Sequence, residues 1–310
     1  MNGRHDLRFG VITDQSIPFA ELRDDWLFVE SLGIDNLWLG DHISLPRMPQ
    51  RPYLECWATL AALAESTSRV RIGPFFANVA TRNPVLHARQ ATTVDGISGG
   101  RLDLGLSAGY YEEEFTWAGI DFPDAAGRRR RFGEAVEIID GVTRGEPVRF
   151  SGEFFTAHEP PAHTGPQFPR PPLWLAAYEP DYLPVIAARV DVVAFFGRQG
   201  TSAHTARQRL LDGMAEVNET LTEAGRDPAT VRRCYLSGNA DERIFESDDS
   251  LADFVGRTAE AGVTDFVFHL FNPVEPLNLA AVGRWADRAA LERAAMNVFP
   301  KLRGTQPSSR

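Results

Sequence analysis

Residues able to do acid/base chemistry stand directly after apolar, strand-like runs of this sequence. Asp41 and His42 follow the run NLWLG, and the stretch RLDLGLSAGYYEEEF (101–115) passes from an apolar run into three small residues, two tyrosines and three glutamates. A histidine titrates near neutral pH and a neighbouring carboxylate can tune it, so we expect Asp41 and His42 to form an acid/base pair. The alternative is that Asp41 caps a turn and His42 packs on a rim.

The small residues Ser107, Ala108 and Gly109 would let a large, flat molecule lie against the backbone. The glutamates that follow, 112–114, are consecutive, so on a helix they point about 100° apart and do not converge on one metal. We therefore interpret all three as the solvated start of a helix, where acidic side chains complement the helix dipole.

Composition excludes several classes of function. The 310 residues carry a formal net charge of -10, which argues against binding to nucleic acids or anionic membranes. The single lysine, Lys301, lies in a polar tail, so no buried amine is present for Schiff-base chemistry. His158 and His163 have no third ligand nearby, and we expect no metal site. Cys56 and Cys234 form no disulfide framework, and without a leader or membrane segment we expect a cytoplasmic protein.

Apolar β-rich runs alternate with segments of helical periodicity. We expect strands at 8–13, 36–40, 71–78, 101–108, 172–177, 191–197, 232–239 and 265–271. We expect helices near 21–33, 54–67, 84–97, 128–143, 181–189, 203–224, 250–262 and 279–298, several of them stopped by Gly33, Gly225 or Gly262. Eight such units predict an α/β fold of the (β/α)8 TIM barrel type, as a single domain over 1–300 with a disordered tail at 301–310. An open, doubly wound sheet is the alternative, but the dinucleotide glycine fingerprint is missing after the first run.

Two segments are too long for plain connections. They are 110–127, after the fourth strand, and 144–171, before the fifth, where PVRFSGEFFTAH suggests a short hairpin. Insertions at these places usually serve the site or a subunit contact.

The active site of a TIM barrel lies at the carboxyl ends of its strands. The residues expected there are largely aromatic, which suits a flat, apolar substrate, although about half of them could instead fill the barrel interior. They are Phe75, Phe76, Tyr110, Tyr111, Tyr178, Phe195, Phe196, His269 and Phe271. The run GRRRRF (127–132) is either a solvated helix face or a patch for an acidic cofactor tail.

Several long stretches resemble one family. They are GDHISLP, the block NPxxxARQxxTxDxxSxGRxxLGxxxG within residues 83–109, and RRFGEAVEIIDGVTRGEPVRFSGEFF. They are similar to the bacterial luciferase-like monooxygenases, and to the branch that uses the deazaflavin coenzyme F420 at least as much as to the branch that uses FMN. The resemblance is strong over 8–175 and weak beyond.

This resemblance implies a tricyclic ring held at the strand ends, with Asp41 and His42 beside its reactive edge. Phe75, Phe76 and Ala77 match the place of a non-prolyl cis peptide bond in the family. Tyr110 replaces a glutamate that acts as the acid in some deazaflavin dehydrogenases, which argues against a sugar-phosphate or alcohol dehydrogenase of that type. The expected catalytic residues are His42, Asp41 and Tyr110; the expected cofactor-binding residues are Phe76, Ala77, Asn78, Ser107, Ala108, Gly109, Tyr178 and Arg198; the expected substrate pocket is Tyr111, Phe195, Phe196, His269 and Phe271.

The chain departs from the family after the fifth strand, where AAYEPDY offers Glu179 and Asp181 in place of phosphate-binding groups. Either a phosphate is held elsewhere, for instance by Arg198, Arg128 or Arg129, or the affinity is weak, or the cofactor has been lost.

Three hypotheses of function follow. The first is hydride transfer with coenzyme F420, in which His42, supported by Asp41, is the acid/base. The second is a monooxygenase that receives reduced FMN from a partner reductase. The third is a barrel without a cofactor that only binds a ligand or partner. The resemblance further implies a homodimer formed through the first helices.

Overall fold

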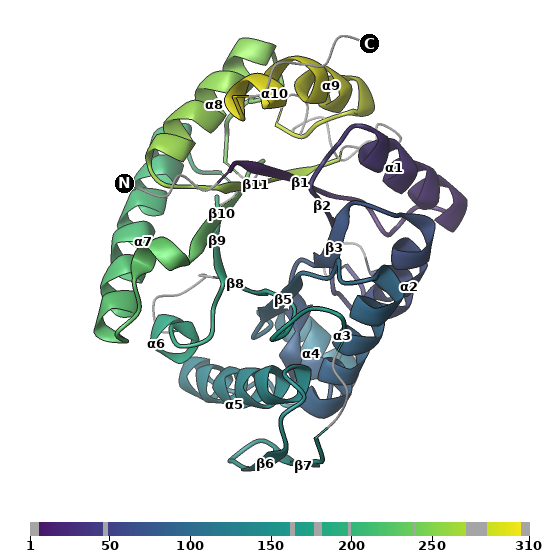
Figure 1. The fold of residues 1–310 in the computed structure, drawn as a ribbon, viewed down its shortest axis with the longest axis vertical. Helices are drawn as coiled ribbons and strands as arrows, with labels where there is room; N and C mark the ends of the chain where they lie inside the picture. The colour runs from purple at the N-terminus through teal and green to yellow at the C-terminus, as the bar shows by residue number, and fades with distance from the viewer. Residues whose placement is uncertain are drawn as a thin grey trace.

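One parallel sheet curls on itself at the centre of the chain, and helices cover its outer side (Figure 1). The structure is a computed structural model that describes residues 6–45, 49–161, 165–176, 182–197, 200–238, 240–270 and 284–304. The strands of this sheet are β1 (Arg8–Ile12), β2 (Asn36–Leu39), β3 (Arg71–Pro74), β4 (Ala77–Asn78), β5 (Leu104–Ser107), β8 (Leu173–Ala176), β9 (Val192–Phe196), β10 (Arg232–Leu236) and β11 (Asp265–His269).

The strands pair in the order β3-β2-β1-β11-β10-β9-β8-β5-β4, all parallel. The expected strand 71–78 is divided into β3 and β4 by Phe75 and Phe76, whose peptide bond is cis, as the family resemblance implies. A parallel bridge between Ile72 and Leu102 brings β3 to the start of β5, and this contact closes the ring. The predicted (β/α)8 TIM barrel is confirmed.

Helices follow the strands as predicted, with different ends. They are α1 (Phe19–Ser31), α2 (Cys56–Ser66), α3 (Pro84–Ser98), α4 (Glu112–Ala118), α5 (Ala125–Thr143), α6 (Leu183–Ile186), α7 (Ala203–Glu223), α8 (Asp248–Glu260), α9 (Arg288–Arg293) and α10 (Phe299–Leu302). Gly33, Gly225 and Gly262 follow the caps of α1, α7 and α8 with φ of +75°, +73° and +106°, which confirms them as stop signals. Within the described ranges, no helix is long and apolar enough to cross a membrane.

The carboxyl-terminal region differs from the prediction. The helix expected at 279–298 begins at Arg288, and a π-helical turn (Ala294–Val298) joins α9 to α10. Lys301 and Leu302 belong to α10, so the disorder expected from 301 is wrong for these two residues; residues 305–310 of the expected tail lie outside the described part of the chain.

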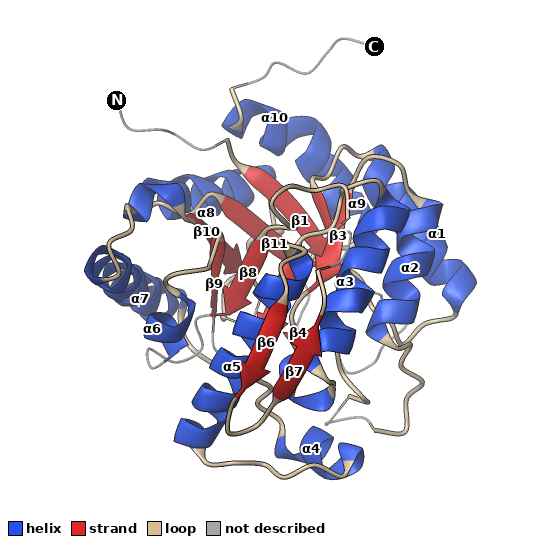
Figure 2. Cartoon of the chain, turned by 60° about the horizontal axis from the view of Figure 1, so that its bottom comes forward, coloured by secondary structure: helices blue, strands red, loops and turns tan. Residues whose placement is uncertain are grey.

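Both insertions contain secondary structure. Segment 110–127 forms α4, and 144–171 contains the predicted hairpin, β6 (Val148–Ser151) and β7 (Thr156–Glu159), in front of α5 in Figure 2. The carboxylate of Glu134 in α5 accepts hydrogen bonds from the backbone N–H groups of residues 153, 154 and 155 at 2.7–3.0 Å. These bonds fasten the hairpin turn to α5.

Side chains alternate between the two faces of the barrel wall. Trp38 and Trp174 lie inside the barrel, with ring centroids 4.6 Å apart, and Gly73 leaves them room, since a Cβ there would come within 2.8 Å of Trp38 and 2.0 Å of a backbone oxygen. Along β9, Val192, Ala194 and Phe196 belong to the interior cluster, whereas Val193 and Phe195 belong to the outer core. Phe195 packs against Gly213 of α7, so its assignment to the substrate pocket was wrong.

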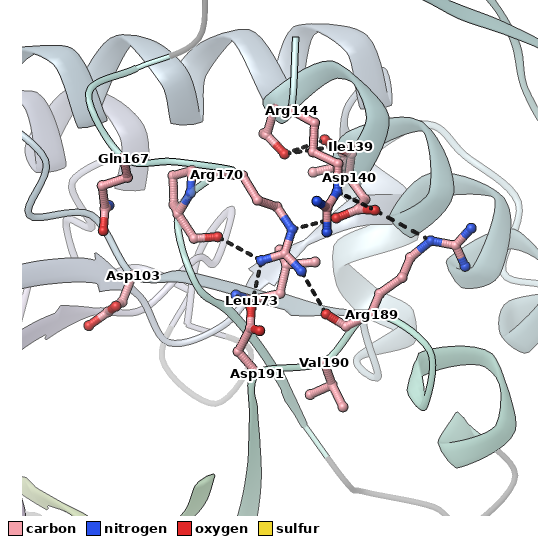
Figure 3. A network of polar contacts seen from close by, with 12 residues as sticks. Asp103, Ile139, Asp140, Arg144, Gln167, Arg170, Leu173, Arg189, Val190 and Asp191 are labelled. Carbon is pink, nitrogen blue, oxygen red and sulfur yellow. Dashed lines mark hydrogen bonds and ion pairs between the residues drawn. The ribbon is translucent and has the colours of Figure 1, made fainter. Parts of the chain in front are cut away.

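A network of ion pairs and hydrogen bonds around Arg170 lies at the amino-terminal ends of β8 and β9 (Figure 3). Arg170, whose side chain is 5% exposed, contacts Asp140 of α5 and Asp191, the latter at 2.5 Å, and donates to the carbonyl of Arg189 at 2.7 Å. Asp191 also accepts from the N–H of Leu173, the first residue of β8. Each charged group of this network is bound within the network, so we interpret the network as structural.

Candidate active site

Two cavities open at the carboxyl ends of the strands. The larger, about 200 Å³, is lined by Asp41, His42, Ile43, Tyr53, Glu55, Thr81, Arg82 and Glu114. The smaller, about 40 Å³, lies between the ends of β5 and β8 and helix α5, and is lined by Ser107, Ala108, Gly109, Tyr110, Arg128, Phe132, Ala176 and Tyr182. We call them the histidine cavity and the glycine cavity.

The carboxylate that contacts His42 is Glu114, not Asp41. Oε1 of Glu114 lies 3.1 Å from Nδ1 of His42 and accepts a hydrogen bond from the N–H of Ile43 at 3.0 Å. Glu114 is only 2% exposed, whereas Glu112 and Glu113 are exposed. The expectation of a solvated helix start is therefore correct for the first two glutamates and wrong for the third.

The carboxylate of Asp41 is bound by other groups of the protein. Its carboxylate accepts from the N–H of Asn78 at 2.9 Å and from both terminal nitrogens of Arg82, at 2.5 and 2.8 Å. Arg82 also reaches Glu55, which caps α2 by accepting from the N–H of Ala58. Burial lowers the pKa of Arg82, but the hydrogen bonds to the two carboxylates outweigh burial and raise it above its ordinary value. Asp41 thus joins the ends of β2 and β4 and does not support His42 as expected.

Two tyrosines flank the imidazole of His42. The ring centroids of Tyr53 and Tyr111 lie 6.0 and 5.9 Å from it. Burial raises the pKa of Tyr53 well above its ordinary value, so its hydroxyl stays protonated and donates to Oε1 of Gln15 at 3.1 Å. Tyr110 is 51% exposed and its ring lies 4.1 Å from that of Tyr111; its catalytic role stays a prediction.

Asn78 offers a free donor beside the small residues. Its Oδ1 accepts from the N–H of Ala80 at 3.0 Å, while its buried Nδ2 has no hydrogen-bond partner among the described residues. Gly109 has φ of +75°, and a Cβ there would lie 2.6 Å from the Asn78 amide. Packing on Asn78 therefore explains Gly109 without any ligand, while Ser107 and Ala108 line the glycine cavity beside it.

Aromatic rings form the interior below the strand ends. The rings of Phe75 and Phe76 lie 4.4 Å apart, and that of Phe196 lies 5.8 and 5.9 Å from them. Ala77 is fully buried in the outer core, among the side chains that face the helices. At the end of β11, His269 stacks on Trp285 at 4.5 Å, and burial lowers its pKa to about 4, which keeps it neutral at physiological pH.

The basic run 127–132 is engaged with the protein. The Arg128 guanidinium lies 4.4 Å from the centre of the Phe122 ring, donates to the carbonyl of Pro123 at 2.7 Å, and lines the glycine cavity. Arg131 donates to the carbonyl of Ala80 at 3.1 Å. Three expected site residues, Tyr178, Arg198 and Phe271, lie outside the described part of the chain.

Sequence reasoning missed Arg82, Glu55, Tyr53 and the role of Glu114. A signal for Glu114 is present: Tyr111, Phe115 and Ala118 repeat with helical spacing, and Glu114 falls on the same face. No local pattern marks Arg82 as the partner of Asp41, because the two are 41 residues apart.

A TIM barrel with an oriented histidine and an unpaired amide at its strand ends has the construction of a barrel enzyme. The chain belongs to the luciferase-like monooxygenase family, whose pattern it matches over residues 7–298, and is thus an oxidoreductase of this class. A protein of Mycobacterium tuberculosis described as uncharacterized is 32% identical over 273 residues, 80% of this chain and 87% of the relative.

Two further proteins are similar over much of the chain. An F420-dependent glucose-6-phosphate dehydrogenase of Kineococcus radiotolerans is 29% identical over 222 residues, 71% of this chain and 61% of that protein. The solved structure of the coenzyme F420 dependent tetrahydromethanopterin reductase from Methanopyrus kandleri superposes with a TM-score of 0.76 at 18% identity, covering 96% of this chain and 99% of the other. At that identity the superposition supports the fold.

Proposed function

We propose that the chain is an oxidoreductase that uses coenzyme F420 for hydride transfer with a flat, largely apolar small molecule. The observation that carries this proposal is the position of His42 at a strand-end cavity, with its Nδ1 held by Glu114. The unpaired amide of Asn78 lies at the strand ends of the same barrel. The family membership and the relatives named as F420-dependent support it.

The residues at the strand ends offer groups that suit a flat ring. The buried, unpaired Nδ2 of Asn78 would donate to a ring carbonyl, and the backbone at 107–109 would provide a surface without bulky side chains. Among the described residues, we assign the guanidinium of Arg128, which lines the glycine cavity, as the group that would bind a cofactor phosphate. When bound, the coenzyme supplies the carbon that exchanges the hydride. His42 exchanges the accompanying proton with the substrate through Nε2, since Nδ1 faces Glu114.

The charges of the histidine cavity favour an uncharged substrate group. Three carboxylates, of Asp41, Glu55 and Glu114, face one guanidinium, and Arg82 is already engaged by two of them. An anionic substituent would meet uncompensated negative charge there. We therefore propose that a sugar phosphate is not the substrate, although one relative is named for glucose 6-phosphate.

Titration of the purified protein with F420 and with FMN, followed by fluorescence, tests the proposal. Micromolar affinity for F420 and none for FMN is expected, and glucose 6-phosphate should not reduce the bound coenzyme. Binding of FMN alone, with dioxygen consumption when reduced FMN is supplied, would favour the second candidate, a two-component monooxygenase, which the family description supports. Binding of neither would leave a ligand-binding barrel.

We also propose that the chain forms a homodimer and works in the cytoplasm with a small-molecule substrate, and that a flavin reductase or an F420 reductase is its partner, according to the cofactor it uses. Sedimentation equilibrium of the purified protein tests the dimer.

A further inference from the structure

Helix α4 brings one of three consecutive glutamates into contact with His42. Glu114 lies in the first turn of α4, 72 residues away from His42 in the chain, and Figure 2 shows α4 apart from the ring of outer helices. The side chain is 3% exposed, whereas that of His42 is 24% exposed. A carboxylate buried to this degree needs hydrogen-bond partners, and this one has two.

Both partners use the same oxygen. Oε1 lies 3.1 Å from His42 Nδ1 and accepts from the N–H of Ile43 at 3.0 Å. The backbone bond fixes the carboxylate relative to the chain segment that carries His42. The adjacent Phe115 is fully buried and packs on Phe122 with ring centroids 4.8 Å apart, which anchors this turn of the helix.

Oε1 of Glu114 accepts a hydrogen bond from the N–H of Ile43, so we take the same oxygen as the acceptor toward His42 as well. Nδ1 of His42 is then the donor, and the lone pair of the imidazole is on Nε2. We propose that Glu114 is the positioning residue of His42: it selects the Nδ1–H tautomer and leaves Nε2 as the nitrogen that exchanges a proton at the histidine cavity. The part of this inference that concerns turnover rests on the proposed function.

The other groups around the imidazole do not supply this bond. Asp41 is taken by Arg82 and the N–H of Asn78. The rings of Tyr53 and Tyr111 are inclined to the imidazole by 65° and 57°, at centroid distances of 6.0 and 5.9 Å, and Tyr53 donates its hydroxyl proton to Gln15. These contacts restrict the ring plane but do not distinguish the two nitrogens. Glu55, the remaining carboxylate of the cavity, is bound to Arg82.

The test uses the ring ¹⁵N chemical shifts of the full chain without cofactor, with the His42 signals assigned from a His42→Gln spectrum. The wild-type protein should show the Nδ1–H tautomer. Glu114→Ala should lose this preference, and Glu114→Asp should restore part of it. Glu113→Gln, an exposed neighbour on the same helix, is the matched control and should leave the spectrum unchanged.

An Nε2–H tautomer in the wild type, or an unchanged His42 spectrum in a folded Glu114→Ala protein, would overturn the assignment. If Glu114→Ala does not fold, Glu114→Gln, which keeps the shape and an acceptor oxygen but loses the charge, serves instead and should weaken the preference. Once substrate is known, Glu114→Ala should lower kcat by at least tenfold with little change in KM. Because the NMR measurement needs no coenzyme, it tests whether Glu114 sets the tautomer of His42 even if F420 does not bind.

Discussion

Asp41 and Arg82 form a bidentate ion pair that joins the end of β2 to the turn after β4, with N–O distances of 2.5 and 2.8 Å. Both side chains are mostly buried, so Arg82→Gln would leave the carboxylate of Asp41 without its counter-charge. We expect a loss of about 3 kcal/mol in the free energy of unfolding, measured with urea. Arg130→Gln, which breaks an exposed pair with Glu153, is the control and should change little. Equal effects of the two substitutions would refute a structural role for the Asp41 pair.

Gly109 and Gly119 share a left-handed backbone conformation but differ in their surroundings. Their φ angles are +75° and +69°; a Cβ at Gly109 would lie 2.6 Å from Asn78, whereas nothing lies within 4 Å of one at Gly119. Gly119→Ala should therefore cost only the backbone strain of about 1–2 kcal/mol. Gly109→Ala should cost clearly more in urea unfolding and should also weaken F420 binding, because it displaces the Asn78 amide. Similar losses would mean that the Asn78 contact is unimportant.

His87 should make the protein sensitive to acid. It is fully buried against Trp57, neither ring nitrogen has a hydrogen-bond partner among the described residues, and burial lowers its pKa from 6.5 to about 3. His87 therefore binds a proton near pH 6.5 in the unfolded chain, whereas in the folded chain it stays neutral until the pH falls to about 3. Stability should be full above pH 6.5 and fall by up to about 1.4 kcal/mol per pH unit below it.

Urea unfolding at pH 7, 6 and 5 measures this slope. His87→Phe should remove the contribution of one titrating group from this slope. The contribution of His269, whose pKa burial lowers to about 4, should remain and has the same sign. Trp57→Phe changes the same contact without removing a titratable group and should keep the wild-type slope. An identical slope in the wild type and His87→Phe would contradict the assignment.

His42 is expected to be needed for turnover and not for folding. Its side chain is 24% exposed at a cavity, so His42→Ala should keep the fold and cost only about 1–3 kcal/mol, for the hydrogen bond that the buried carboxylate of Glu114 loses. Loss of an acid/base group typically lowers the rate by about 10²–10⁴-fold. Hydride transfer with F420 measures this, and His158→Ala, an exposed histidine of β7, should have no effect. Activity within a few-fold of the wild type would exclude the acid/base role.

The fold could be predicted because its signal is local and repeated. Each βα unit carries its own apolar run and helical period, and stop residues such as Gly33 act within one turn. The partners inside the site could not be read in this way. Glu114 is one of three identical neighbours, and only the packing of α4 decides which one turns inward. Arg82 meets Asp41 because β2 and β4 end side by side, a fact of the closed barrel and not of either segment.

Phe195 and Phe196, neighbours in β9, also show that the sequence alone does not tell which side chains reach the site, and they allow a direct test. Both were expected in the pocket, but successive side chains of a strand point to opposite faces, so only one can face the barrel interior. Phe195 is 5% exposed against α7, and Phe195→Ala should cost about 3–5 kcal/mol of stability without changing F420 affinity. Phe196 meets Phe75 and Phe76 inside the barrel.

Phe196→Ala should therefore cost less stability than Phe195→Ala, because its side chain is only partly buried, and should weaken F420 binding by removing a ring below the strand ends. Urea unfolding and fluorescence titration on the same two variants separate stability from binding. If Phe195→Ala weakened binding while Phe196→Ala did not, the inward and outward faces of β9 assigned here would be reversed. The two adjacent phenylalanines thus act as controls for each other, since they have the same chemistry and differ only in the face of β9 they occupy.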